Sequence, residues 1–80
     1  MLFSKRISLS NLQAQYMMGL VYWTGNGAKK DMATSYYWMS LATNGGHQEA
    51  VNWKLKAAEQ ITAEQRATVD KTIADKLKRH

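Results

Sequence analysis

Two histidines and six acidic residues are the side chains of this 80-residue chain that could support acid–base catalysis or bind a metal ion. His47 follows a pair of glycines and His80 is the last residue, so neither has the spacing to another histidine or a cysteine that a metal site requires. The acidic residues are scattered and form no nucleophile–base arrangement. We therefore expect no catalytic residue, no metal site and no cofactor, and we do not expect an enzyme.

Gly25-Asn26-Gly27 has the form of a phosphate-binding loop. It lacks the preceding strand and the final Lys-Ser/Thr pair that give such loops their chemistry. Glycine is instead common just past the end of a helix, because it accepts the left-handed backbone conformation used there. The motif therefore predicts the end of a helix near Thr24, and Asn44-Gly45-Gly46 predicts a second helix end.

The net charge of +5 is concentrated near the N-terminus. Residues 1–30 contain Lys5, Arg6, Lys29 and Lys30 and no acid, whereas residues 31–80 carry seven basic and six acidic side chains. Such an excess most often forms a solvated surface that keeps a protein soluble. The alternative is a small basic nucleic-acid-binding protein, for which these four residues would have to converge on one face.

Composition favours a single small domain without covalent crosslinks. Eighty residues without cysteine must be stabilised by efficient packing or by association. The longest apolar run, Tyr16 to Trp23, is far shorter than the roughly 20 residues that span a bilayer. The first ten residues lack the apolar stretch and cleavage site of a secretory signal. We therefore expect a cytoplasmic protein that makes no membrane contact.

Apolar spacing and capping residues predict an all-α fold. Ser10 with Gln13, and Thr62 with Gln65, have the form of a capping box, and Asp31 is a natural N-cap. With the two glycine-rich stops, these signals predict helices over 10–24, 31–44, 47–60 and 62–78. Two further apolar stripes are expected near the chain ends, formed by Phe3 and Ile7 and by Val69, Ile73 and Leu77.

Gly19 is predicted to let a second helix come close to the first. A glycine in a helix interior costs about 1 kcal/mol relative to alanine, so close approach of another backbone is its expected purpose. Ala14 is expected to extend the same groove, and Trp38 is expected to be the residue that anchors the second helix there.

Part of the first half of the sequence recurs after 36 residues: Ser10 corresponds to Gly46, Gln13 to Glu49 and Ala14 to Ala50. Periods of this size are typical of solenoids built from helix pairs. The chain also resembles the Sel-one-like repeat family, relatives of tetratricopeptide repeats. The matching positions are Ala14, Met18 in place of leucine, Gly19, Tyr22, Gly25, Gly27, Ala28 in place of valine, Asp31, Trp38, Ala42 and Gly46.

The resemblance implies a right-handed α-α solenoid that acts as an adaptor or scaffold without catalysis of its own. It covers one full repeat, residues 10–46, of a single domain spanning 1–80. The second copy begins at Ala50 but departs from the pattern, because Lys54 and Leu55 stand where leucine and glycine are expected. Residues 47–80 are therefore interpreted as a partial repeat and a capping helix.

A protein or peptide partner is the expected ligand, because aromatic residues and methionine are enriched in interface cores. Met17, Trp23 and Tyr37 occupy positions that are commonly polar in the family, and they either join the local core or form an exposed contact patch. The predicted partner-binding residues are Gln13, Met17, Leu20, Trp23 and Tyr37. Because about three repeats are normally needed for stability, homo-oligomerisation is a further expectation.

Overall fold

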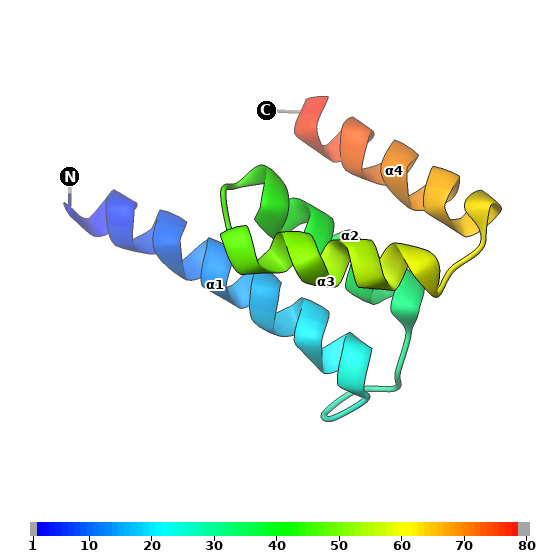
Figure 1. Ribbon diagram of the computed structural model, residues 1–80. Coiled ribbons are helices and arrows are strands. Elements are labelled where there is room, and N and C mark those ends of the chain that lie inside the picture. The colour runs from blue at the N-terminus through cyan, green and yellow to red at the C-terminus, as the bar shows by residue number, and fades with distance from the viewer. Residues whose placement is uncertain (1, 79–80) are drawn as a thin grey trace.

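The computed structural model describes the backbone of residues 2–78 and the side chains of residues 12–76 and 78. Over that range the chain forms four helices and no strand: α1 Leu2–Thr24, α2 Met32–Asn44, α3 Gln48–Glu59 and α4 Ala63–Lys78. This confirms the all-α prediction (Figure 1). The described side chains do not include the predicted stripe of Phe3 and Ile7, nor those of Lys5, Arg6 and Leu77.

Two of the predicted helix starts are formed by the expected side chains. At the start of α2, Asp31 Oδ1 accepts hydrogen bonds from the backbone amides of Ala33 (3.1 Å) and Thr34 (3.2 Å). At the start of α4, Thr62 Oγ1 accepts from the Gln65 amide and Gln65 Oε1 accepts from the Thr62 amide, each over 3.0 Å. Both arrangements satisfy amides that have no partner within the helix.

The predicted start of the first helix at Ser10 is wrong. Helix α1 runs without a break from Leu2, so Ser10 lies inside the helix and is not its cap. A capping serine needs an extended backbone, and no proline or glycine occurs between Leu2 and Met18 to end a helix before Ser10. The Ser-x-x-Gln pattern is therefore an internal helical sequence here.

The connection from α1 to α2 depends on glycines with a left-handed backbone. Gly25 and Gly27 have φ angles of 77° and 106°, which L-residues with side chains rarely adopt. The loop closes where the Asp31 amide donates to the Tyr22 carbonyl over 2.9 Å. The two glycines thus turn the chain back so that α2 packs along α1.

Helix α2 is the central element. It packs against α1, α3 and α4, and Figure 1 shows α1 and α4 on either side of the α2–α3 pair. The central cluster of the core consists of Met39 and Ala42 from α2 and Ala50 from α3, all of which are fully buried. Around it pack three half-buried residues, Tyr16, Leu20 and Trp53. Alanine at two of the three central positions allows the helix axes to approach closely.

Gly19 is buried in the α1–α2 interface, but the space that it leaves is filled by a side chain of α2 and not by a second backbone. A Cβ on Gly19 would lie 2.7 Å from Met39 Cε and 2.8 Å from Met39 Sδ. The Ser35 hydroxyl donates to the Gly19 carbonyl oxygen over 2.7 Å. The predicted anchor, Trp38, is half-buried and packs edge-to-face on Tyr37. Ala14 is exposed, so the expectation that it lines this groove is wrong.

Helix α4 is attached to α2 by a buried tyrosine. Tyr36 is 2% exposed, and its hydroxyl donates to Asp70 Oδ1 over 2.7 Å. The pKa of the Tyr36 hydroxyl is raised, mainly by burial and secondly by the hydrogen bond to Asp70, and Arg66 partly opposes this rise. Ile73, 6% exposed, adds an apolar contact one turn further along α4. The attachment of α4 therefore depends on a neutral tyrosine.

We expect Gly19→Ala to destabilise the protein by about 1 kcal/mol, because overpacking against Met39 costs about 1–3 kcal/mol and exceeds the gain in helix propensity. In a Met39→Ala background the same substitution should instead stabilise by up to about 1 kcal/mol. Urea unfolding of the four proteins, followed by circular dichroism in the presence of a stabilising osmolyte, measures this coupling. Equal effects of Gly19→Ala in both backgrounds would contradict the close approach.

We expect Tyr36→Phe to cost about 1.5 kcal/mol at neutral pH, since a hydrogen bond to a carboxylate is lost. An unfolded tyrosine ionises near pH 10, whereas the raised pKa keeps folded Tyr36 protonated to higher pH. The contribution of Tyr36 is therefore fully present below about pH 10 and is lost as the pH rises through the folded-state pKa.

The measurement is the free energy of unfolding of both proteins between neutral and alkaline pH. The advantage of the wild type over Tyr36→Phe should shrink above about pH 10. Tyr37→Phe is the matched control, because it makes the same chemical change at the adjacent, half-buried position. A Tyr37→Phe variant as unstable as Tyr36→Phe would argue against the assigned role of Asp70.

Candidate protein-interaction surface

An aromatic pair joins α1 to α3. The rings of Trp23 on α1 and Trp53 on α3 meet edge-to-face, with centroids 5.2 Å apart and an interplanar angle of 76°. The Lys56 ammonium lies 5.3 Å from the centroid of the Trp53 ring. Both indoles are half-buried, so each also presents part of its ring to solvent. Such rings combine a large apolar area with few rotatable bonds, which suits them to binding.

A row of side chains precedes Trp23 along α1. Gln13, Met17 and Leu20 follow one another at four- and three-residue spacing and therefore share one side of the helix. Gln13 is exposed, Met17 is 50% exposed and Leu20 is half-buried. We call this row together with the indole pair the α1–α3 face, defined by Gln13, Met17, Leu20, Trp23 and Trp53.

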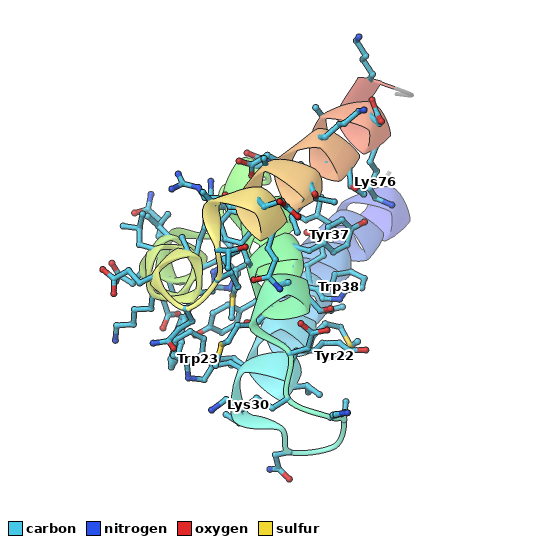
Figure 2. The ribbon with its side chains drawn as sticks, turned by 90° about the vertical axis from the view of Figure 1, so that its right-hand side faces the viewer. Tyr22, Trp23, Lys30, Tyr37, Trp38 and Lys76 are labelled. Carbon is cyan, nitrogen blue, oxygen red and sulfur yellow. The ribbon has the colours of Figure 1, made fainter. Side chains whose placement is uncertain are left out.

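The α1–α3 face contains four of the five residues predicted to bind a partner. The fifth, Tyr37, lies elsewhere, and Figure 2 shows it with Trp38 and Tyr22 on a different side of the molecule from Trp23. The Tyr37 ring packs edge-to-face on Trp38 with centroids 5.3 Å apart. It also borders a shallow hollow of about 210 Å³ between α2 and α4, where Val69 is among the lining residues. The predicted patch is thus divided between two surfaces.

Sequence reasoning did not include Trp53 among the binding residues. Its three- and four-residue spacing from Ala50 and Ala57 placed it in an apolar stripe, and both alanines are indeed fully buried. The feature that distinguishes Trp53 is the size of its side chain. Its indole is much larger than the methyl groups of the two buried alanines, so it extends beyond the helix interface that those alanines form. Its edge therefore reaches the surface beside Trp23.

The remaining repeat positions have structural roles or are exposed. Gly25, Gly27 and Gly46 have positive φ angles at helix ends, and Asp31 is the N-cap of α2. Gly19, Ala42 and Ala50 lie in the buried interior. Tyr22 and Trp38 are half-buried, and Ala14 is exposed. With the exception of Ala14, these positions shape the helix ends or the helix packing, although Gly25, Gly27, Asp31 and Gly46 are themselves exposed.

His47 has a packing role. Its ring stacks on Tyr16 with centroids 4.2 Å apart and an interplanar angle of 18°, and its Nδ1 atom is buried without a hydrogen-bond partner. Within the part of the chain that the structure describes, no group of three or more histidine, cysteine or acidic side chains is placed to hold a metal ion. The geometry around His47 thus connects the start of α3 to α1.

The basic residues of the α1–α2 loop, Lys29 and Lys30, are exposed. The nucleic-acid alternative requires Lys5 and Arg6 to converge with them, and these two residues are not among the side chains that the structure describes. Along residues 2–78, none of the helices is sufficiently long and apolar to cross a bilayer.

No protein-family model, no curated protein and no solved structure matches this chain. The resemblance to Sel-one-like repeats therefore remains a prediction from the residues quoted above, and the α1–α3 face is the surface on which a functional proposal can be based.

Proposed function

We propose that this chain is a non-catalytic protein-interaction module of the helical-repeat kind, and that a short segment of a partner protein binds along the α1–α3 face. The observation that carries the proposal is the partly exposed Trp23–Trp53 pair, with Leu20 packed against the same buried cluster as Trp53 and the half-exposed Met17 three residues before Leu20 on α1. Trp is among the residues most enriched at binding hot spots, and methionine adapts its shape to different partners.

The arrangement of the helices supports the repeat interpretation. If 10–46 is one helix pair and α3 begins the next, then α1 and α3 are the first helices of successive pairs. The Trp23–Trp53 and Tyr16–His47 contacts place α1 beside α3, with α2 packed against both. Helices related in this way line one continuous surface in a solenoid, and such surfaces are the ones that repeat proteins use for binding.

The chemistry of the face favours an apolar or amphipathic segment with an acidic group. No charged residue occurs in α1 between Leu12 and Thr24, so the α1 side of the face is neutral. On the α3 side, the Lys56 ammonium lies 5.3 Å from the Trp53 ring centroid and can meet a carboxylate of the partner at the edge of the interface. The core of the interface would then be apolar and its rim charged, as in other protein complexes.

The proposal is tested by selecting binding peptides from a random display library against the wild-type chain. Their affinities are then measured by fluorescence anisotropy for wild type, Met17→Asp and Val51→Asp. We expect Met17→Asp to weaken binding about ten-fold or more, because it places a charge in an apolar interface. Val51→Asp is the matched control, because it makes the same kind of change at a residue that is 39% exposed. Val51 lies two residues before Trp53, which places it about 200° away around α3.

Val51→Asp should bind within about two-fold of wild type, a difference well below 1 kcal/mol. Circular dichroism melts of both variants establish that they fold. If the selected peptides bind all three proteins equally, the α1–α3 face is not the binding surface. Light scattering of the same proteins shows whether a second copy of the chain occupies the face, in which case Met17→Asp alone should lower the apparent mass.

A further inference from the structure

A second surface, distinct from the α1–α3 face, lies where α2, α3 and α4 meet. There the three helices enclose a cleft of about 370 Å³. Its lining residues come from all three helices: Tyr36, Ser40, Asn44, Lys54, Arg66, Asp70, Ile73 and Ala74. This volume is at the lower end of the range typical of small-molecule sites, which is about 300–1,000 Å³.

The charged side chains lining the cleft carry a net positive charge. Lys54 from α3 and Arg66 from α4 are the cations, and Asp70 is the anion. One oxygen of Asp70 already accepts the hydrogen bond from the Tyr36 hydroxyl over 2.7 Å. The carboxylate is therefore held at the α2–α4 contact, and the two cations line the cleft from two different helices, α3 and α4.

A buried hydroxyl without a partner lies at the α2 wall of the same cleft. Ser40 is 2% exposed, and its Oγ atom has no hydrogen-bond partner. Leaving a buried polar group unpaired costs about 1–3 kcal/mol, so such groups call for an explanation. An acceptor entering the cleft from solvent would satisfy the Ser40 hydroxyl, and the amide of Asn44, one turn along α2, is a second donor on the same wall.

We propose that the α2–α3–α4 cleft binds a small oxyanion, the carboxylate or phosphate group of a small ligand, between Lys54 and Arg66, with the Ser40 hydroxyl as a hydrogen-bond donor. The guanidinium of Arg66 can donate two parallel hydrogen bonds to such a group, and the ammonium of Lys54 supplies a point charge. Charge-assisted bonds of this kind are about twice as strong as neutral ones.

The geometry of α3 separates this site from the protein-interaction surface. Lys54 and Lys56 are two residues apart, which corresponds to about 200° around a helix. Lys54 lines the cleft, whereas Lys56 lies over the Trp53 ring. The two lysines therefore belong to different surfaces, and substituting them separately distinguishes a specific site from a general effect of positive charge.

The test is a titration of the ¹⁵N-labelled chain with inorganic phosphate and, separately, with acetate, at constant ionic strength set by sodium chloride. We expect saturable amide shifts in α2 near Ser40 and Asn44, in α3 near Lys54 and in α4 near Arg66. Lys54→Met and Arg66→Met should each lower the affinity about ten-fold. Lys56→Met, the matched control on the same helix, should leave it unchanged.

Ser40→Ala should weaken binding by a smaller factor, about three-fold, because it removes one neutral donor. The melting temperature gives a second readout that needs no resonance assignment. It should rise with phosphate or acetate concentration for wild type and Lys56→Met but not for Lys54→Met. The anion that binds the wild type more tightly identifies the ligand as a phosphate or a carboxylate.

Two results would overturn the proposal. One is the absence of saturable shifts and of thermal stabilisation with both anions. The other is an equal loss of affinity in Lys54→Met and Lys56→Met, which would show that the anions respond only to net charge. Neither result bears on the peptide-binding proposal, because Met17, Trp23 and Trp53 do not line the cleft.

Discussion

The close packing of α1 on α2 at Gly19 is the constraint on which the rest of the structure depends. Because Gly19 has no Cβ, Met39 occupies the space that a side chain would fill, and the Ser35 hydroxyl reaches the Gly19 carbonyl. A second close contact forms near the other end of the same interface, where a Cβ on Gly45 would clash with Leu12. These contacts fix both the distance between the helices and their register.

The position of α2 then determines where the other helices can pack. With one side of α2 against α1, the fully buried Ala42 and Ala50 bring α3 close on the adjoining side. Trp53 is thereby placed against Trp23, which creates the α1–α3 face. Helix α4 is held on a further side of α2 by Tyr36 and Asp70, and the space left between α4 and α3 is the cleft. Both candidate surfaces thus follow from the packing around one helix.

Local signals in the sequence predicted the helices well because each signal acts within a few residues. Asp31 and the Thr62–Gln65 pair cap their helices as expected, since a cap depends only on adjacent backbone. The Ser10 pattern failed because the same residue types are compatible with a helix interior when nothing upstream breaks the helix. A capping sequence therefore predicts a helix start only where the preceding residues disfavour helix.

Long-range packing was predicted less well, for geometric reasons. The sequence predicts close contact at Gly19, but the residue opposite it is Met39 and not Trp38. Adjacent residues of a helix point about 100° apart, and the crossing angle of the two helices decides which of them faces the partner. Ala14 and Gly19 are five residues apart, about 140° around the helix. They therefore could not share one groove, and helical periodicity alone predicts this.

The two candidate surfaces differ in a way that single-residue patterns do not reveal. Trp53 and Lys54 are adjacent in sequence and point about 100° apart, so the first belongs to the α1–α3 face and the second lines the cleft. The cleft combines Ser40, Lys54 and Arg66 from three helices, and only the positions of those helices bring the residues together. Since α3 contributes to both surfaces and packs on α2 through small, fully buried alanines, a shift of α3 would change both surfaces together.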